Sequence, residues 1–401
     1  MQCIHNGFGL HKLGRELTGP EYAAVYANMV RSRSIRVYAE TTVTSVTRER
    51  IVTAQSKDGI LKFQAKAVIM AMGCRERSRG ALNICGSRPA GIYSAGTAQK
   101  LVNLMGYMPG KRCVILGSGD IGLIMARRMT LQGAKVLACV ELMPYSSGLN
   151  RNIVQCLEDY DIPLYLSHTV TDIVGRDRVK KIVIQKVDEN RTPIPGTEIT
   201  FECDTLLLSV GLIPENELSK QAGICLNPRT SGPEGYENME TTIPGVFACG
   251  NVLHVHDLVD YVTKEAQRAG QSAAAYLLGN KLPDEVAYRI EAADDVTYTV
   301  PSKLHPGLTD KTVSVFCRVR RVFGKSRIVV SDGEAELCSF PRIHMAPGEM
   351  ERIKKKEKKL ADFDDITHAA LRLLVKETSD GFEKTKEMCR KLMKIAAEYE
   401  E

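Results

Sequence analysis

Residues Val114–Glu141 read VILGSGDIGLIMARRMTLQGAKVLACVE, and this stretch decides the fold. It predicts a short apolar strand, a glycine turn, an amphipathic helix and a second strand that ends in a carboxylate. In such a unit Gly117 permits the sharp turn, Gly119 lets the backbone approach a pyrophosphate, and Gly122 lets helix and strand pack closely. Unpaired N–H groups at the start of the helix attract phosphate charge. The stretch predicts a dinucleotide site made of Gly117, Ser118, Gly119, Asp120, Ile121 and Gly122.

Glu141 indicates which dinucleotide the site prefers. It follows the first glycine at close to the spacing of about 20 residues expected for the acid that binds the adenosine ribose hydroxyls. A carboxylate there repels a 2′-phosphate, and the next residues, LMPY, offer no cation to bind one. The sequence therefore favours NAD(H) over NADP(H). A nucleotide-free α/β turn is the alternative interpretation.

Length and composition are typical of a globular protein with several domains. The chain has 401 residues, enough for two or three cores, with 44% hydrophobic and 25% charged residues. No apolar run reaches the length of a membrane span, and the first residues lack the order of a secretory signal, so we expect a cytoplasmic protein. The net charge of +6 is modest, and the basic run RIKKKEKK contains no aromatic residue, which argues against nucleic-acid binding.

The twelve cysteines are spread along the chain and form no CxxC motif. Metal-ribbon and thioredoxin-like spacings are therefore absent, and we predict no metal site from the sequence. Several cysteines lie in apolar runs that resemble strands. We expect most of them to be small buried side chains in a reducing compartment.

A second set of signals flanks the glycine stretch. Two buried-strand runs end in glycine, AKAVIMAMG at Ala65–Gly73 and CDTLLLSVG at Cys203–Gly211. The run PGVFACGN at Pro244–Asn251 precedes a loop with histidines and a helix-like stretch at Tyr261–Leu278. One dinucleotide unit does not need all of these runs, so they imply a second nucleotide-binding domain that the first one interrupts. Gly73 and Gly211 are predicted to contact a cofactor.

These segments resemble the flavoprotein oxidoreductases with two dinucleotide-binding domains, the group of the pyridine nucleotide-disulfide oxidoreductases and thioredoxin reductases. The most similar branch contains the FAD-binding subunits of hydrogen cyanide synthase, opine oxidase and the sarcosine oxidase alpha chain. The likeness covers about residues 1 to 350. It is carried by QCIHNGFG, LTGPEYA, GSRPAGIYSAGTAQKLVN, GSGDIGLIMARR and GNVLHVHDLVDYVTKEAQRAG.

The resemblance implies that the chain binds FAD as well as NAD. By position, Gly250 and Asn251 would meet the ribityl chain of the flavin, and Val262 and Thr263 would start a helix that points at it. The family has aspartate where this chain has Asn251, but an amide can also bond a hydroxyl. The family also opens with its own GxGxxG unit before the segment matched by QCIHNGFG. We therefore expect an N-terminal truncation of about 30 to 45 residues, roughly one βαβ start.

The chemistry expected from two cofactors is hydride transfer between NAD(H) and flavin. Because the chain has no CxxC, electrons need an external partner, and the related enzymes are hetero-oligomers, so we expect an oligomer with a redox subunit. Cys3 is a candidate redox residue, with packing as its alternative role. His5, His254 and His256 fall in stretches expected to meet at the flavin, where a histidine tunes it or moves a proton. Backbone contacts at a domain seam are the alternative for each.

The predicted fold class is α/β, with two Rossmann-like three-layer domains, the NAD domain inserted in the FAD domain. A small β-rich domain and a charged tail follow. The tail is predicted to be helical because its apolar residues recur at helical spacing; they are Ile366, Ala369, Ala370, Leu373 and Leu374, and then Met388, Leu392 and Ile395. The expected domains are residues 1–108 and 241–290 (FAD), 109–240 (NAD), 291–350 (β-rich) and 351–401 (tail).

Two other functions fit the sequence. The first is a non-catalytic scaffold subunit that keeps the fold but cannot hold FAD. The second is a dehydrogenase that uses the GSGDIG site alone on a small substrate; it leaves the GVFACGN run without a purpose.

Overall fold

The computed structural model describes residues 8–280, 288–305, 312–333, 335–356 and 370–377. Its described residues divide into two compact units, and each is interrupted in sequence by the other. Unit 1 draws on Met1–Thr41, Met72–Glu215 and Leu258–Thr263; unit 2 draws on Thr42–Ala71, Asn216–Asp257 and Lys264–Glu401. Among the described residues, no helix is both long and apolar enough to cross a bilayer.

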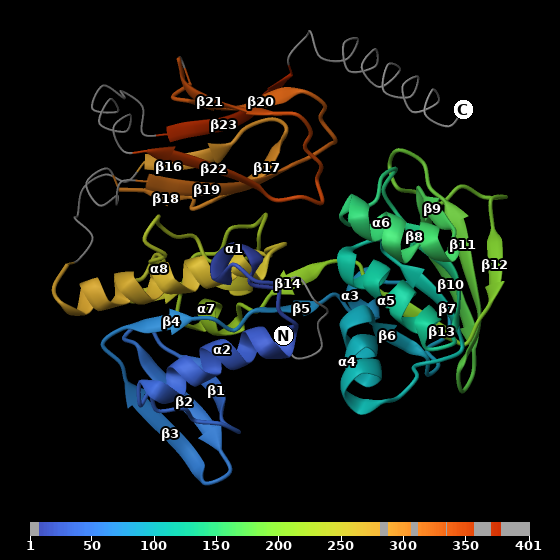
Figure 1. Cartoon of the computed structure of the whole chain (residues 1–401), viewed down its shortest axis with the longest axis horizontal. Coiled ribbons are helices and arrows are strands. Elements are labelled where there is room, and N and C mark those ends of the chain that lie inside the picture. Colours follow the sequence, from blue (N-terminus) through green and yellow to red (C-terminus); the bar gives the residue numbers. More distant parts are fainter. Residues whose placement is uncertain (1–7, 281–287, 306–311, 334, 357–369, 378–401) are drawn as a thin grey trace. The chain divides into compact units, whose positions relative to one another are not determined.

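A five-stranded parallel sheet forms the centre of unit 1 (Figure 1), with the strand order β6-β13-β7-β8-β9. The strands are β6 (Ile92–Ser94), β13 (Thr205–Leu208), β7 (Arg112–Leu116), β8 (Lys135–Glu141) and β9 (Leu164–Leu166). The helices α4 (Ala95–Met105), α5 (Asp120–Leu131) and α6 (Asn150–Cys156) cover one face, and a short 3-10 turn η1 (Glu158–Tyr160) follows α6.

The opposite face of this sheet packs against a three-stranded antiparallel sheet of β10 (His168–Gly175), β11 (Val179–Lys186) and β12 (Ile199–Glu202). Strand β7 shows how the sequence specifies both layers. Cys113 and Ile115 point to the helices, whereas Val114 and Leu116 point to the antiparallel sheet, because successive side chains alternate between faces. All four side chains are buried, so the strand reads as a continuous apolar run. The predicted Rossmann-like three-layer unit is confirmed.

Shorter elements complete unit 1. A two-stranded ribbon joins β5 (Cys74–Glu76) to β14 (Leu212–Pro214) in antiparallel register. The helices α1 (Leu10–Leu13), α2 (Gly19–Ser32) and α3 (Arg79–Leu82) belong to this unit as well. Helix α2 starts at a capping box, in which Thr18 and Glu21 each accept a hydrogen bond from the backbone N–H of the other residue.

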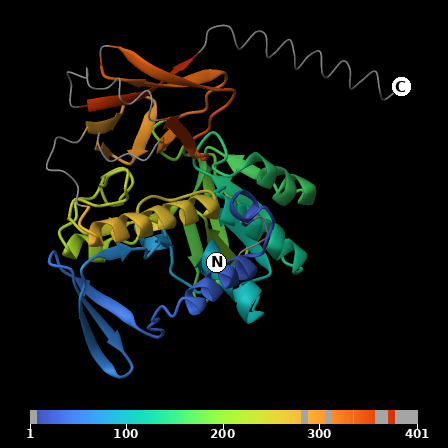
Figure 2. The same ribbon diagram turned by 60° about the vertical axis from the view of Figure 1, so that its left-hand side comes forward.

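Unit 2 contains the second set of predicted strands. β4 (Val68–Met70) pairs in parallel with β15 (Val246–Ala248), and α8 (Val259–Leu277) packs on them through Ala269 and Ala273. The antiparallel meander β1 (Thr42–Val46), β2 (Ile51–Ser56) and β3 (Gly59–Gln64) forms a separate sheet, drawn in blue in Figure 2. Helix α7 (Glu217–Gln221) and the 3-10 turn η2 (Gly250–Val252) complete this part.

From Tyr288 onward, the residues of unit 2 that the structure describes form strands and the turns between them. One sheet has the order β18-β16-β23-β20-β21 and the other the order β17-β19-β22, and both enclose one apolar core. The strands are β16 (Tyr288–Ala292), β17 (Val296–Val300), β18 (Lys303–Leu304), β19 (Thr312–Val319), β20 (Ser326–Ser331), β21 (Glu336–Arg342), β22 (Glu351–Lys356) and β23 (Ala370–Glu377). The β content expected after residue 290 is present, and further strands lie past residue 350.

The predicted helical tail is wrong where the structure describes it, because Glu351–Lys356 and Ala370–Glu377 are strands. In β23, Leu371 and Leu373 are buried, whereas Arg372 and Lys376 are exposed, which is the two-residue period of a strand. Pairing with β16 on one side and β20 on the other decides the conformation in favour of the strand. The remaining tail positions, including Ile366, Met388, Leu392 and Ile395, lie outside the described residues. The predicted domain boundaries stay a prediction.

Candidate functional site

The glycine loop between β7 and α5 is held tightly by Ser209, at the end of β13. Gly117 has a φ of +95°, and a Cβ there would lie 2.1 Å from the Ser209 carbonyl oxygen. A Cβ on Gly122 would lie 2.6 Å from the Ser209 Cβ. The Gly122 N–H donates to the Ser209 hydroxyl at 3.0 Å. The two glycines are therefore required by close approach, and Ser209 is a site residue that the sequence analysis missed.

The Glu141 carboxylate is buried beside the loop and accepts hydrogen bonds from four donors. Its Oε2 accepts from the Ser118 N–H at 3.0 Å and the Ser118 hydroxyl at 2.5 Å. The same oxygen accepts from the Ser147 hydroxyl at 3.2 Å, and Oε1 accepts from the Met143 N–H at 3.0 Å. The acid at the end of β8 is thus oriented by the loop itself before any ribose arrives.

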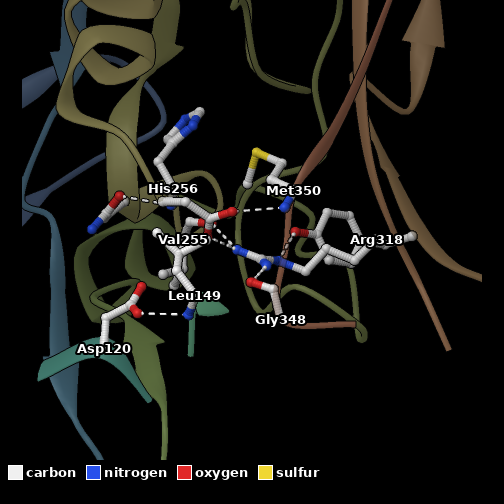
Figure 3. A network of polar contacts seen from close by, with 10 residues as sticks. Asp120, Leu149, Val255, His256, Arg318, Gly348 and Met350 are labelled. Atoms are coloured by element: carbon white, nitrogen blue, oxygen red, sulfur yellow. Dashed lines mark hydrogen bonds and ion pairs between the residues drawn. The ribbon is translucent and has the colours of Figure 1, made fainter. Parts of the chain in front are cut away.

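Helix α5 presents its N-terminus at the same loop. Its N-cap residue, Gly119, supplies no side-chain cap. The Asp120 carboxylate turns aside to accept from the Leu149 N–H at 2.8 Å and the Asn152 amide at 2.7 Å, the first of which is drawn in Figure 3. Ile121 packs against the core on the helical side of the sheet. A helix start whose N-cap residue has no side chain, next to two glycines in close contact with Ser209, fits the pyrophosphate of a dinucleotide.

All seven residues predicted for the nicotinamide site are thus brought together, from Gly117 to Gly122 with Glu141. The predicted cofactor glycines Gly73 and Gly211 lie instead at opposite ends of the β5–β14 ribbon. The Gly73 carbonyl accepts from the Glu215 N–H, and the Gly211 carbonyl accepts from the Arg77 N–H. Their cofactor contact stays a prediction.

The predicted flavin residues of unit 2 lie in the segment after β15. Gly250 is buried, with a φ of +73°, and its N–H donates to Glu265 Oε2 at 2.9 Å. The Asn251 Oδ1 accepts from the His256 N–H at 3.1 Å, which bends the segment back on itself. Glu265, on α8, is a second residue that the sequence analysis missed.

His254 and His256 meet at Glu265. His254 Nε2 lies 2.9 Å from Oε1, and His256 Nε2 lies 2.9 Å from Oε2. The ring centroids of the two histidines are 4.1 Å apart. Burial lowers the pKa of His254 and favours its neutral form. Burial also opposes ionisation of Glu265, but the two imidazoles outweigh it and lower the pKa of that carboxyl to about 2.

A second polar network holds the same segment against the β-rich part of unit 2 (Figure 3). Arg318 on β19 donates to the carbonyl oxygens of Gly348 and Val255, at 2.6 and 3.3 Å, and forms an ion pair with Asp257. The other carboxylate oxygen of Asp257 accepts from the Met350 N–H at 2.6 Å. In Figure 3 the His256 side chain points away from this network.

Helix α8 begins earlier than predicted. It starts at Val259 rather than at Val262 or Thr263, because Asp260 lies in its first turn, where a negative charge stabilises a helix N-terminus. The Thr263 hydroxyl lies 2.7 Å from the Tyr22 hydroxyl of the same unit. The other predicted catalytic residues, Cys3 and His5, lie outside the described residues.

The fold is shared with solved flavoenzymes. The crystal structure of thioredoxin reductase from T. acidophilum matches with a TM-score of 0.56 and 23% sequence identity, over 69% of this chain and 86% of that one. Thioredoxin reductase from Lactococcus lactis matches with a TM-score of 0.55 and 16% identity, over 69% of this chain and 87% of that one.

Sequence comparison gives relatives with named activities. An NADH oxidase of Methanocaldococcus jannaschii is 24% identical over 268 residues, which is 64% of this chain and 55% of the relative. An NAD(P)H sulfur oxidoreductase (CoA-dependent) of Pyrococcus abyssi is 25% identical over 215 residues, which is 52% of this chain and 45% of the relative. The chain thus spans about half the length of these curated relatives.

The family model for pyridine nucleotide-disulphide oxidoreductases matches residues 2–273. That range contains the glycine loop with Glu141, the parallel sheet beneath it and the β15–α8 segment with its two histidines. The family uses FAD and NAD(P)H as cofactors. With its sequence match over more than half of its length and its three-layer dinucleotide fold, the chain belongs to the pyridine nucleotide-disulphide oxidoreductase family.

Proposed function

We propose that this chain is an FAD-dependent oxidoreductase that exchanges hydride with NAD(H). The observation that carries the proposal is the glycine loop with a pre-oriented acid. The N-terminus of α5 faces the pyrophosphate, and Glu141 accepts hydrogen bonds from the adenosine ribose hydroxyls in place of Ser118 and Ser147. The same carboxylate repels a 2′-phosphate, so NADH is preferred over NADPH.

The flavin is proposed to lie against the segment after β15 and the start of α8. Gly250 and Asn251 are the residues assigned to its ribityl chain, and Val262 and Thr263 belong to the helix that faces it. When bound, nicotinamide and flavin supply the hydride chemistry, and the protein positions them. His254, neutral in its buried site, holds or moves a proton at Nδ1, the ring nitrogen that does not face Glu265.

Electrons are proposed to leave through a second protein. The sequence has no CxxC motif, so it lacks the internal disulfide acceptor of thioredoxin reductases. The likeness to the FAD-binding subunits of cyanide synthase, opine oxidase and sarcosine oxidase supports a partner subunit that carries another redox group, within an oligomer. The structure describes eight free thiols, which supports a reducing location such as the cytoplasm; they are Cys85, Cys113, Cys139, Cys156, Cys203, Cys225, Cys249 and Cys317.

The decisive experiment is visible absorbance of the purified chain mixed with excess FAD, desalted, and then reduced anaerobically with NADH. Flavin bands that survive desalting and bleach faster with NADH than with NADPH are the expected result. In Glu141→Gln the bleaching by NADH should slow, whereas Glu202→Gln, an exposed acid on β12, should match the wild type.

A flavin-free scaffold is the second candidate. One observation favours it: in the described residues, β4 and β15 form a sheet of only two strands, and Ile69 of β4 is 42% exposed. A protein that comes off the desalting column colourless but still quenches NADH fluorescence would support a nucleotide-binding scaffold. Loss of both signals would contradict both candidates.

A further inference from the structure

Three buried side chains in unit 2 present metal-binding atoms to one another. They are His254, His256 and Glu265, whose candidate ligand atoms all lie within 4.8 Å of each other. Two imidazole nitrogens and a carboxylate oxygen are an established ligand set for Zn²⁺. With bonds of about 2.0–2.1 Å, neighbouring tetrahedral ligands lie about 3.3 Å apart. The two nitrogen–oxygen separations of 2.9 Å are close to this value, and a bound ion would draw the widest pair together from at most 4.8 Å.

The hydrogen bonding of the cluster is incomplete. His256 Nε2 lies 2.9 Å from Glu265 Oε2, yet within the described part of the chain this ion-pair contact is not matched by a hydrogen bond of normal geometry. The Nδ1 atoms of both rings are likewise buried without a hydrogen bond to any described residue. A buried polar atom without a partner costs about 1–3 kcal/mol. A cation between the three side chains would bind the lone pair of His256 Nε2, to which the carboxylate cannot donate a hydrogen bond.

The surroundings fix the three side chains in place. Gly250 donates its N–H to Glu265 Oε2, and Asn251 accepts from the His256 backbone, so contacts outside the set orient two of its members. The Phe316 ring lies 5.4 and 5.5 Å from the two imidazole centroids. The side chains of His254, His256 and Glu265 are only 1%, 0% and 5% exposed. A position this enclosed keeps a bound ion away from bulk solvent and suits an ion that stabilises the fold.

We propose that His254, His256 and Glu265 bind one divalent transition-metal ion of the zinc class. The three side chains supply three ligands, and a water molecule supplies the fourth. The ion ties the segment after β15 to helix α8, within unit 2. It takes no part in hydride transfer, and the inference stands independently of the proposed function.

The first test is elemental analysis of the untagged, full-length protein produced with added Zn²⁺ and dialysed against a weak chelator. About one equivalent of zinc should remain in the wild type. It should also remain in Glu237→Gln, which removes a buried carboxylate elsewhere in unit 2. Glu265→Gln and His256→Gln should lose the ion at chelator concentrations at least about 10-fold lower. Folded wild-type protein without zinc, or equal retention in all four proteins, would overturn the proposal.

A second test does not depend on whether the variants fold. Zinc X-ray absorption of the wild type should show a first shell of nitrogen and oxygen only, with the outer-shell scattering of two imidazoles. Cys249 directly precedes Gly250 and is buried, so it is the thiol best placed to bind in place of the carboxylate. A sulfur atom in the first shell, or a shell without imidazole, would refute the assigned ligand set.

Discussion

The Glu141 carboxylate has a structural role in the loop and a proposed role in binding NADH, so its replacement should affect both. In Glu141→Ala the buried donors of Ser118 and the half-buried donors of Ser147 and Met143 lose their acceptor, and each buried donor costs about 1–3 kcal/mol. We expect a clear fall in the thermal midpoint and at least about a 10-fold weaker affinity for NADH, equivalent to 1.4 kcal/mol. Calorimetry and NADH fluorescence titration measure the two effects.

The matched control for this prediction is Glu202→Ala, an exposed acid on β12 in the same unit. It should leave both quantities within about 0.5 kcal/mol of the wild type. If Glu141→Ala weakened NADH binding while the midpoint stayed unchanged, the hydrogen bonds from the loop would contribute nothing to stability.

Gly122 and Ser209 should be energetically coupled. Gly122→Ala places a methyl group 2.6 Å from the Ser209 Cβ and 2.9 Å from the Gly117 carbonyl oxygen, so it should be strongly destabilising. Ser209→Gly removes the first of these clashes and leaves the second. In a double-mutant cycle measured by chemical denaturation, we expect a coupling of about 0.5–3 kcal/mol that partly rescues Gly122→Ala. Additive effects would show that the two residues do not press on one another.

Glu237 should make stability depend on pH. Burial raises the pKa of its carboxyl from 4.5 to about 7, and both of its oxygens accept from the His305 N–H at 3.1 Å. Below pH 4.5 the Glu237 carboxyl is protonated in both the folded and the unfolded chain, so its full contribution to the stability of the fold is present. As the pH rises from 4.5 to 7 the unfolded chain ionises first, and up to roughly 3 kcal/mol of stability is lost.

Glu237→Gln imitates the protonated carboxyl and should remove this dependence. Denaturation midpoints measured between pH 5 and 8 should show that the stability of the variant, relative to that of the wild type, increases as the pH rises. Glu291→Gln, at an exposed position on β16, reports the effect of losing a surface charge alone. A difference between Glu237→Gln and wild type that stays constant with pH would contradict the burial argument.

At the scale of elements, strand β23 offers a direct test of its conformation. Leu373 is 1% exposed in the β-rich core, whereas Arg372 beside it is exposed. Leu373→Ala should therefore cost about 2–5 kcal/mol of unfolding free energy, and Arg372→Ala less than about 0.5 kcal/mol. Thermal unfolding of both variants and of Leu371→Ala measures whether the loss of stability alternates between the buried and exposed positions of β23. Equal losses at Arg372 and Leu373 would indicate that the strand is assigned the wrong face.

Most elements could be predicted from sequence because their signals are local. The run Val114–Leu116 before Gly117 specifies a buried parallel strand, and the glycine spacing specifies the turn into α5. The β23 segment could not be read in the same way. Over so short a stretch its apolar residues fit both a helical and a strand period. The strand forms because the segment pairs with β16 and β20, which are distant in sequence.

At the scale of the whole molecule, the thiols should fall into reactive and inert groups. Cys85 and Cys225 are exposed, whereas burial raises the pKa of Cys113, Cys139 and Cys317 to about 12. In a background with Cys3, Cys389 and the half-buried Cys74 and Cys338 replaced by serine, Ellman's reagent at neutral pH should react rapidly with Cys85 and Cys225. Cys85→Ser and Cys225→Ser should each remove one rapid equivalent. Rapid labelling that survives both substitutions would contradict the burial pattern.

The candidate sites were predictable to different degrees across the chain. The proposed nicotinamide residues are Gly117–Gly122 and the acid Glu141 at the spacing that the motif expects, so one motif located all of them. Ser209 was missed because it approaches from the end of a strand about 90 residues later in the sequence. The histidines were singled out, but their meeting with Glu265 depends on how the segment after β15 folds back on α8. Such convergence is set by tertiary packing, which residue spacing alone does not encode.

The shared hydrogen bonding of Glu141 also limits how this site can evolve. A lineage that replaced this acid by a residue able to bind a 2′-phosphate would first pass through a protein in which the hydroxyls of Ser118 and Ser147 have lost their hydrogen-bond acceptor. Substitutions at those serines would be neutral or harmful before the exchange and helpful after it. The order in which mutations accumulate would therefore matter, and a switch of coenzyme would be reached through few of the possible paths.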